Sequence, residues 1–441
     1  MTFDDLNLNN PLRNALQDMD YLNPTPIQRE AFPIIMSGKD VVGVAQTGTG
    51  KTFAYLLPLL RMHKFSKEKN PRVLIVVPTR ELVIQQVGEL EKLTKYMNVK
   101  VGGVYGGTNI NTQKQILVDG VDFLVGTPGR LLDLSYAGFL KMKTIKKLVI
   151  DEVDEMMNLG FRPQLTSLLD LLPERRQNLL FSATLTKEVE HLVNTFFARP
   201  HKIEIAPHGT PLEQIIQKGY QVPNFNTKAN LLELLLQTDM EMSKVLVFVS
   251  TKRLADKLFE IINEKFPDQI GIIHSNKSQN FRINAVKNFH EGNSRVLMAT
   301  DIIARGIDVR EITHVVNFDI PDEPENYIHR IGRTGRADKA GQAISFISER
   351  EQEYQEAIEN LMNMPISMEE LPETVVISDQ LIDEEKPQMA GNKHYFKAPT
   401  IKHSKGAFHE KKDKNKKVNM AHEKRMARLK EKKKARRKKR K

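Results

Sequence analysis

The sequence feature that most constrains the fold is a glycine-rich loop of eight residues, Ala45–Thr52, which reads AQTGTGKT. An apolar run, Val41–Val44, precedes the loop and predicts a buried strand, and a helix-compatible stretch, Phe53–Met62, follows it. A strand, a glycine-rich loop ending in Gly-Lys-Thr and a helix form an arrangement that holds a triphosphate, because backbone N–H groups and the helix N-terminus face the anion. The loop therefore predicts a nucleotide-binding α/β domain.

The chemistry of the loop residues predicts their individual roles. Lys51 is a mobile positive charge that can reach the β- and γ-phosphates, and the Thr52 hydroxyl can bind Mg²⁺. Ala45 stands where the generic pattern has Gly, so the alternative is a glycine-rich turn with a surface lysine, which the flanking strand and helix disfavour. The other nucleotide-binding candidates in the loop are Gln46, Thr47, Gly48, Thr49 and Gly50.

Apolar strand-like runs alternate with helical periods on both sides of a Pro/Gly-containing break, which predicts two parallel sheets covered by helices. The strands expected in the first series are 41–44, 73–77, 99–102, 123–125, 148–150 and 178–181, with helices such as 80–97 and 186–197 between them. Those expected in the second series are 245–249, 270–274, 296–299, 315–318 and 343–347. The expected organisation is an ATP-binding domain over 1–205, a linker over 206–213, a second domain over 214–368 and a disordered tail over 369–441.

Charge and composition narrow the class of protein. Residues 401–441 contain 20 Lys/Arg and 4 Asp/Glu, and removing them from the 66 and 55 of the whole chain leaves 46 basic and 51 acidic residues. The expected picture is a mildly acidic body with a basic arm that binds nucleic acid. The chain has no Cys, which excludes disulfides and thiolate metal sites, and it has no apolar run of about 18 residues that would span a membrane. We expect a cytoplasmic protein.

An acidic cluster, Asp151–Asp154, directly follows the expected strand 148–150. A carboxylate at the end of a buried strand beside a phosphate loop suits Mg²⁺ held through water, which we assign to Asp151. A second carboxylate beside it, Glu152, can orient and deprotonate the attacking water. The alternative is an acidic helix N-cap, which the presence of the phosphate loop makes less favourable.

The second series carries closely spaced arginines in His329–Arg336, which are poor core material unless they meet anions. Arg333 and Arg336 are candidates for arginine fingers on the γ-phosphate, and a solvated basic surface is the alternative. Ser182–Thr184 ends the next strand of the first series and either relays hydrogen bonds between the domains or caps a helix.

Several short segments near strand ends carry Thr hydroxyls, Gly amides and Arg side chains, which are common phosphate partners. They lack the interleaved aromatic residues expected of base stacking, so we expect a nucleic-acid strand held by its backbone without sequence readout. Each segment taken alone could instead be a helix cap or a turn. The residues selected from these segments are Thr79, Arg80, Gly106, Gly107, Thr127, Arg130, Arg282, Thr300 and Asp301.

The ordered set of motifs over residues 1–368 closely resembles that of the DEAD-box RNA helicases. The matching segments are Pro24–Gln28, Ala45–Thr52, Pro78–Leu82, Gly106–Gly107, Thr127–Arg130, Asp151–Asp154, Ser182–Thr184, Val245–Thr251, Gln279–Arg282, Thr300–Asp308 and His329–Arg336. The family also has Ala at the position of Ala45. Residues 175–181 and 276–279 look like the bacterial RhlE-like branch.

The resemblance implies two RecA-like domains that close on ATP and RNA. It implies that Gln28 reads adenine, that Phe3 stacks near the base, and that Gly306 and Asp308 contact the nucleotide, Asp308 on the ribose side. It adds Thr251 to the RNA contacts and assigns His329 to coupling with Ser182 and Thr184.

The expected function is RNA-stimulated ATP hydrolysis coupled to local, non-processive unwinding or remodelling of short RNA duplexes, with ATP and Mg²⁺ as cofactors. Ribosome assembly or RNA turnover, with ribosomal or RNA-decay partners, is the expected setting, and a monomer is the expected state. Two alternatives are a passive RNA-binding or annealing protein and a DNA helicase of the same architecture.

Three positions depart from the family pattern. Val153 replaces the Ala of the acidic motif, Asp20 stands where a Gly often precedes the aromatic residue, and Ser275 follows His274 where Gly is usual. We expect altered local geometry or rate at these positions and no loss of activity.

Overall fold

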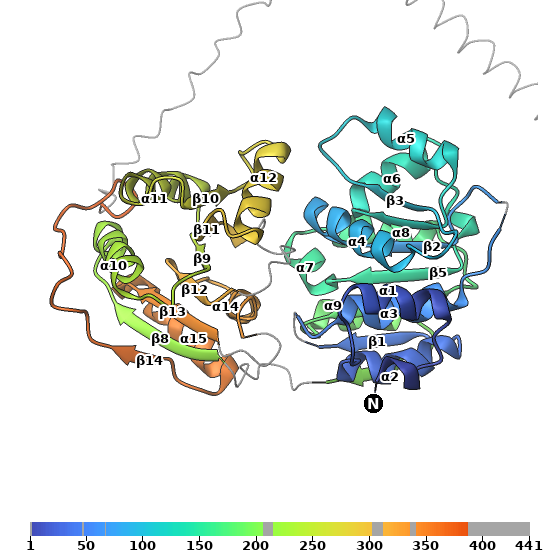
Figure 1. The fold of residues 1–441 in the computed structure, drawn as a ribbon, viewed down its shortest axis with the longest axis horizontal. Coiled ribbons are helices and arrows are strands. Elements are labelled where there is room, and N and C mark those ends of the chain that lie inside the picture. The colour runs from blue at the N-terminus through green and yellow to red at the C-terminus, as the bar shows by residue number, and fades with distance from the viewer. Residues whose placement is uncertain are drawn as a thin grey trace, which may run out of the picture. The chain divides into compact units, whose positions relative to one another are not determined.

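The computed structural model describes residues 2–45, 48–66, 68–205, 215–301, 312–335 and 341–386. The described chain contains two sheets, each of seven parallel strands and each covered by helices (Figure 1). Both sheets belong to one compact unit that ends at Glu385. The predicted fold class, two tandem α/β domains, is confirmed.

The first sheet has the strand order β3-β4-β2-β5-β6-β1-β7. Its strands are β1 (Val41–Val44), β2 (Val73–Val76), β3 (Val101–Val104), β4 (Phe123–Gly126), β5 (Lys147–Asp151), β6 (Gln177–Ser182) and β7 (His201–Glu204). Its helices are α1 (Asn10–Asp18), α2 (Pro26–Met36), α3 (Lys51–Met62), α4 (Arg80–Leu93), α5 (Ile110–Asp119), α6 (Pro128–Tyr136), α7 (Val153–Asn158), α8 (Arg162–Leu171) and α9 (Lys187–Phe196).

Both faces of this sheet are buried under helices. Successive side chains of a strand point to opposite faces, so neighbouring residues enter different apolar clusters. Val41 packs in the apolar cluster formed with α1 to α4, whereas Val42 packs in the cluster formed with α6 to α9. Ile75 and Leu74 divide between the same two clusters. A parallel strand buried on both faces reads as a continuous apolar run, which is why the central strands could be predicted.

The second sheet has the order β10-β11-β9-β12-β13-β8-β14. Its strands are β8 (Ile215–Gln221), β9 (Val245–Phe248), β10 (Ile270–Ile273), β11 (Val296–Ala299), β12 (His314–Asn317), β13 (Gly341–Ile347) and β14 (Ser367–Glu369). Its described helices are α10 (Phe225–Thr238), α11 (Lys252–Lys265), α12 (Gln279–His290), α14 (Pro324–Ile331) and α15 (Gln352–Met362). One face packs against α10 and α11, and the other against α12, α14 and α15.

The observed strands differ from the predicted ones mainly at the sheet edges. β3 lies at 101–104, two residues later than predicted, and β7, β8 and β14 were not predicted. β7 and β14 end their sheets and expose most of their side chains, so neither has the apolar run that marks a buried strand. Edge strands of this kind leave little hydrophobic signal in a sequence.

The packed part of the second domain extends beyond residue 368, which corrects its expected boundary. Residues 371–385 run along α10, where Val375 and Ile382 are buried in the apolar cluster. The Asn224 side-chain amide donates to the carbonyl of Ser378 at 2.5 Å, and the Ser378 N–H donates to Thr227 Oγ1 at 3.0 Å. The tail expected from residue 369 therefore begins no earlier than 386; the expected linker and residues 387–441 lie outside the described residues.

The structure shows how the backbone or the core accommodates each of the three departures from the family pattern. Asp20 has φ +57°, in the left-handed region that favours Gly, and Asp tolerates this region better than most side chains because its short polar group bonds locally. Ser275 is not among the described residues with positive φ, so its backbone has no need of Gly. Val153 begins α7 and is fully buried in the apolar cluster that also contains Leu148 and Ile150 of β5.

Candidate nucleotide and RNA site

The phosphate loop lies between β1 and α3, as predicted. Gly48 and Gly50 have φ of +84° and +87°, conformations that only Gly adopts readily, and Gly50 immediately precedes α3. Lys51 is buried, and its Nζ donates to the carbonyl oxygen of Ala45 at 2.7 Å. The ammonium group is therefore held beneath the loop, at the helix N-terminus. Gln46 and Thr47 lie outside the described residues.

Gln28 connects the segment proposed to read adenine with the phosphate loop. Its Oε1 accepts from the Thr25 N–H at 3.0 Å, and its Nε2 donates to the Gly50 carbonyl at 3.0 Å. A Cβ at Gly50 would meet Gln28 Nε2 at 2.4 Å, so the close approach requires Gly. Phe3, the expected stacking residue, is 5% exposed and packs in the apolar cluster of the first domain.

Asp151 ends β5 and is held by three donors. Tyr55 Oη and Gln86 Nε2 both donate to its Oδ2, at 2.7 and 3.0 Å, and the Glu152 N–H donates to Oδ1 at 3.0 Å. Burial, together with the Asp151 charge, raises the pKa of Tyr55 well above its ordinary value, so its hydroxyl remains protonated and donates. The carboxylate is thus fixed at the carboxyl edge of the sheet.

Glu152 adopts a left-handed conformation with φ +52° and precedes α7. Burial raises the pKa of its carboxyl group to about 7, with Arg333 opposing the shift and Asp151 adding to it. A strained backbone and a carboxyl group that titrates near neutrality are both common where a side chain takes part in chemistry. Glu152 can therefore accept a proton near physiological pH.

Asp154 joins the acidic cluster to Ser182–Thr184. Its Oδ2 accepts from the N–H groups of Ala183 and Thr184, at 3.1 and 2.8 Å, and from Thr184 Oγ1 at 3.0 Å. Nε2 of His329, on α14, lies 3.8 Å from the same oxygen. Burial opposes ionisation of Asp154, but the positive charges of His329 and Lys51 lower its pKa. His329 therefore meets Thr184 through Asp154.

A pocket collects residues from the phosphate loop, the acidic cluster and α14. Lys51, Glu152, Asp154, His329 and Arg333 are among its lining residues. Lys51 and Arg333 bring positive charge into a pocket that Glu152, Asp154 and Glu155 also line, and these two cations can pair with a bound phosphate chain. Arg336, Gly306 and Asp308 lie outside the described residues.

Three of the predicted RNA contacts precede helices that start at strand ends. Thr79 and Thr251 are the N-caps of α4 and α11, each accepting a hydrogen bond from a backbone N–H three residues on, and Thr127 is the N-cap of α6. The remaining N–H groups of such helix ends attract anions. These positions suit binding of a phosphate backbone.

Arg80 lies beside Gly107, although the two residues are 27 positions apart in the sequence, and Gly106 directly precedes Gly107. Gly107 has φ +76°, and a Cβ there would meet the Arg80 guanidinium at 2.4 Å. Arg130 is buried and donates to Gln113 Oε1 at 2.6 Å and to the Thr108 carbonyl at 3.0 Å. Because Gln113 also donates to the Tyr105 carbonyl, Arg130 supports the shape of the glycine loop from within.

Replacing Gly107 with Ala should displace the Arg80 side chain and weaken binding of single-stranded RNA by about tenfold, the effect expected for one charge-assisted interaction. Titrations at several salt concentrations should also give a salt slope shallower by about 0.7, corresponding to one neutralised phosphate. Gly138→Ala is the matched control, because Gly138 has φ +80° and nothing lies within 4 Å of a Cβ there. Equal RNA affinities for the two variants would contradict the placement of Arg80.

Two of the RNA-contact candidates in the second domain, Arg282 and Asp301, make ion pairs. Arg282 is buried and its Nη1 lies 2.8 Å from Glu81 Oε1, next to Arg80 in the sequence. Asp301 accepts from Arg330 Nε and Nη2 at 2.6 and 2.7 Å. Thr300 directly follows β11 and precedes Asp301. Arg282 and Asp301 thus act within a network of side chains as well as being candidates for contact with RNA.

Sequence reasoning missed the partners that hold these groups in place. They are Tyr55, Glu81, Gln86, Gln113 and Arg330. All but Glu81 and Arg330 lie outside the motifs, and a buried polar residue on an amphipathic helix gives no distinctive pattern. Only Tyr55 carried a weak signal, because it lies four residues after Lys51 and therefore near the same side of α3.

Two family profiles match the chain: DEAD/DEAH box helicase over residues 25–192, and helicase conserved C-terminal domain over residues 226–338. The chain is 39% identical to the DEAD-box ATP-dependent RNA helicase CshA of Streptococcus pneumoniae, over 82% of this chain and 68% of that protein. It is 37% identical to the RNA helicase CrhR of Synechocystis, over 88% and 78%.

Solved structures agree with these matches. A structure of S. cerevisiae Dbp5 bound to RNA and ADP BeF3 has a TM-score of 0.76 at 29% identity, covering 84% of this chain and 95% of that one. A structure of Mss116p bound to ssRNA and AMP-PNP has a TM-score of 0.77 at 28% identity, covering 84% and 80%.

The two parallel sheets, the Gly-Lys-Thr loop and the adjacent acidic cluster define a nucleotide-hydrolysing enzyme built from tandem RecA-like domains. The chain belongs to the DEAD/DEAH box helicase family. It is an ATP-dependent RNA helicase, as the resemblance implied. None of the described helices is long and apolar enough to cross a membrane.

Proposed function

We propose that the chain is an RNA-stimulated ATPase that separates short RNA duplexes locally, with each chemical role carried by a residue of the pocket. The observation that carries the proposal is the gathering of Lys51, Glu152, Asp154, His329 and Arg333 around one pocket. Lys51 would hold the phosphates and Glu152 would take the proton of the attacking water. Arg333, with Arg336, would stabilise the charge that develops on the γ-phosphate.

The proposal includes Mg²⁺ held by Asp151 and Thr52, mostly through water. Among the described residues, no group of three or more His, Cys, Asp or Glu side chains is arranged to hold a metal ion. That suits Mg²⁺, which keeps several waters and is usually bound by one or two protein oxygens together with substrate phosphates. The fixed carboxylate of Asp151 close to the phosphate loop fits this requirement. When bound, the ion neutralises phosphate charge.

A strand-separation assay tests local unwinding. Fluorescently labelled RNA duplexes of increasing length, each with a single-stranded extension, are mixed with the protein and ATP. The proposal expects a separation rate that falls steeply with duplex length and does not depend on the polarity of the extension. Equally fast separation of long and short duplexes would show translocation along the strand and contradict it.

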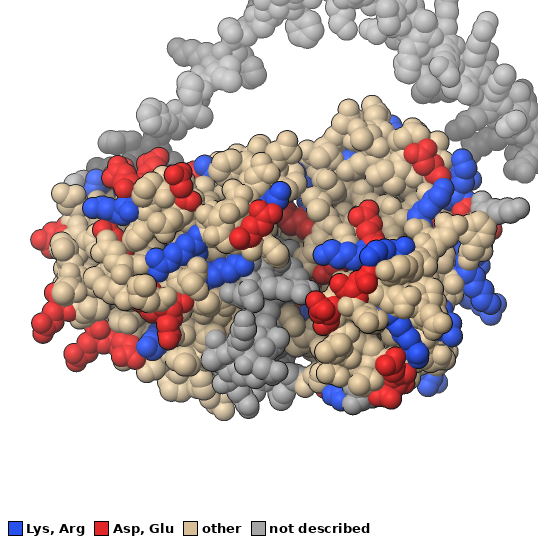
Figure 2. All heavy atoms as spheres, in the orientation of Figure 1, with Lys and Arg blue, Asp and Glu red and all other residues tan. Residues whose placement is uncertain are grey.

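The basic segment 401–441 is proposed to add non-specific affinity for RNA. On the face drawn in Figure 2, blue and red side chains are interspersed over the described residues, with no large area of one sign. The positive excess of the chain is in residues 401–441, with 20 Lys/Arg and 4 Asp/Glu. Such a segment binds nucleic acid by releasing counterions from phosphate.

Deleting residues 401–441 should therefore weaken RNA binding and flatten its salt dependence, by about 0.7 in slope for each phosphate that the segment neutralises. ATP hydrolysis at saturating RNA should be unchanged, because the catalytic candidates remain. Affinity measured by fluorescence anisotropy at several salt concentrations checks this. An unchanged slope would mean that the segment has another role, such as docking a partner protein.

We propose no branch of the DEAD/DEAH box helicase family for this chain. The RhlE-like branch suggested by residues 175–181 and 276–279 has no support among the compared relatives, which are named CshA and CrhR. A role in ribosome assembly or RNA turnover, action as a monomer and a cytoplasmic location remain parts of the proposal; the basic segment and the absence of Cys are compatible with them.

A further inference from the structure

Two buried polar side chains outside the motifs converge on one oxygen of Asp151. Tyr55 comes from the second turn of α3, the helix that follows the phosphate loop, and Gln86 comes from α4, the helix that Thr79 caps. Tyr55 Oη lies 2.7 Å from Asp151 Oδ2, and Gln86 Nε2 lies 3.0 Å from the same atom. We propose that Tyr55 and Gln86 are positioning residues that hold the Asp151 carboxylate for Mg²⁺, an inference that rests on the proposed role of Asp151.

Both of these side chains are buried, so their polar groups depend on hydrogen-bond partners within the protein. Tyr55 is fully buried and Gln86 is 1% exposed, so each polar group has given up its water partners and must find one in the protein. Gln86 Oε1 has no hydrogen-bond partner among the described residues, which leaves the Nε2 contact with Asp151 as the polar contact that accounts for an amide at this position. An apolar side chain would fill the same space without leaving a buried acceptor unpaired.

The ring of Tyr55 is fixed from another direction. It packs against Phe181 of β6, with ring centroids 5.1 Å apart and planes inclined by 47°. Tyr55 lies on α3, the helix that also carries Thr52 in its first turn. Tyr55 therefore contacts Asp151 and lies one turn from Thr52 on the same helix, and its aromatic packing leaves the hydroxyl little freedom to move.

Three hydrogen bonds fix the orientation of the Asp151 carboxyl group. Oδ2 is held by the two side chains and Oδ1 by the Glu152 N–H, so rotation of the carboxyl group would break all three contacts. Partners of this kind, which bond the ligand and not the metal, fix its orientation, and their removal usually lowers metal affinity about 10–100-fold. We therefore expect Tyr55 and Gln86 to tune Mg²⁺-dependent nucleotide binding.

The test measures binding of a fluorescent ATP analogue to the full chain as Mg²⁺ is titrated, for Tyr55→Phe, Gln86→Leu and the double variant. Each single change should raise the Mg²⁺ concentration at half-maximal binding about tenfold, while affinity for the analogue in EDTA stays the same. Tyr327→Phe is the matched control, because Tyr327 is also fully buried and its hydroxyl donates to Gln217 at 3.0 Å in the second domain. Thermal melting of each variant separates loss of folding from loss of metal affinity. Tyr55→Phe removes a single oxygen atom and so changes the packing least.

The Asp151→Asn variant separates the proposed Mg²⁺ role of Asp151 from the positioning role of Tyr55 and Gln86. A shifted Mg²⁺ midpoint in Asp151→Asn with normal midpoints in Tyr55→Phe and Gln86→Leu would overturn the positioning role alone. A normal midpoint in Asp151→Asn would overturn the Mg²⁺ assignment itself, and the inference with it. If both residues act through Asp151, adding Tyr55→Phe to Asp151→Asn should produce no further shift in the midpoint.

Discussion

Replacement of Glu152 by Gln is expected to lower the rate of RNA-stimulated ATP hydrolysis by a factor of about 10²–10⁴, the usual contribution of a general base. Gln keeps the size and shape of the side chain but accepts no proton from water. Glu152 is also the residue whose pKa burial raises to about 7, so the group removed is one that can exchange a proton near neutrality. Binding of ATP and of RNA should be retained, because Gln keeps the shape of the side chain and the proposed role of Glu152 is to accept a proton.

Single-turnover hydrolysis and equilibrium binding together check this prediction. Glu188→Gln is the matched control, since Glu188 is an exposed residue in the first turn of α9 and the change removes the same charge. Normal turnover in Glu152→Gln would remove Glu152 from the role of base. Loss of ATP binding in the same variant would instead indicate that the left-handed backbone at this position depends on the carboxylate.

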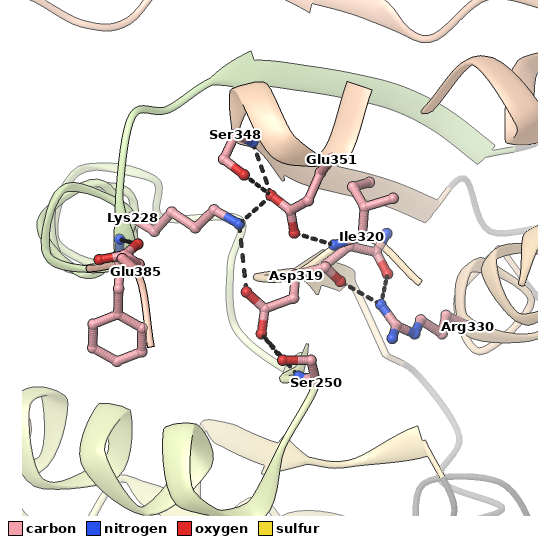
Figure 3. Close-up of polar contacts among 10 residues, drawn as sticks. Lys228, Ser250, Asp319, Ile320, Arg330, Ser348, Glu351 and Glu385 are labelled. Carbon is pink, nitrogen blue, oxygen red and sulfur yellow. Dashed lines mark hydrogen bonds and ion pairs between the residues drawn. The ribbon is translucent and has the colours of Figure 1, made fainter. Parts of the chain in front are cut away.

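Replacement of Lys228 by Met is expected to lower the free energy of unfolding of the second domain by up to about 3–5 kcal/mol, because it leaves two largely buried carboxylates, each with a side chain 13% exposed, without their cation. Lys228 Nζ lies 2.7 Å from Glu351 Oε2 and 3.4 Å from Asp319 Oδ1, and its side chain is 5% exposed (Figure 3). Asp319 also accepts from the N–H and hydroxyl of Ser250, and Glu351 from the N–H of Ile320 (Figure 3). The lysine thus ties α10 to the segments that follow β12 and β13.

Hydrogen exchange of peptides from the second sheet, followed in urea, measures this loss. Lys265→Met is the control, because Lys265 pairs with Glu233 at 3.8 Å on the surface and such a pair contributes about 0–1 kcal/mol. Adding Glu351→Gln to Lys228→Met should recover part of the stability, since removing a charge together with its partner is less damaging than leaving it buried alone. Equal stabilities of Lys228→Met and Lys265→Met would show that the network contributes little.

The sequence predicted most of the fold because the central strands are buried on both faces. Val73–Val76 and Val245–Phe248 read as continuous apolar runs, and each strand end was marked by Gly, Pro, Thr or Asp. The edge strands β7 and β14 carry no such run. The packing of residues 371–385 on α10 was missed because only scattered residues of the segment, such as Val375 and Ile382, enter the core.

The candidate site was predictable where chemistry requires a fixed residue type at a fixed spacing, as at Lys51, Asp151 and Glu152. Which side chains would hold these residues was not, because the partners come from distant segments: 96 residues separate Tyr55 from Asp151, and 65 separate Gln86 from it. Spacing also could not reveal that Arg130 is buried and supports the glycine loop, or that the carboxamide of Gln28 bonds to Gly50. Such contacts depend on side-chain packing between elements.

Steady-state ATP hydrolysis without nucleic acid, with single-stranded RNA and with DNA of the same sequence shows whether RNA activates this enzyme. We predict a low rate of hydrolysis without nucleic acid, strong stimulation by RNA and little stimulation by DNA. Equal stimulation by DNA would contradict the assignment of RNA as the activating strand and favour a DNA helicase of the same architecture. No stimulation by either strand, with ATP still bound, would contradict the coupling of RNA binding to hydrolysis and favour a passive RNA-binding or annealing protein.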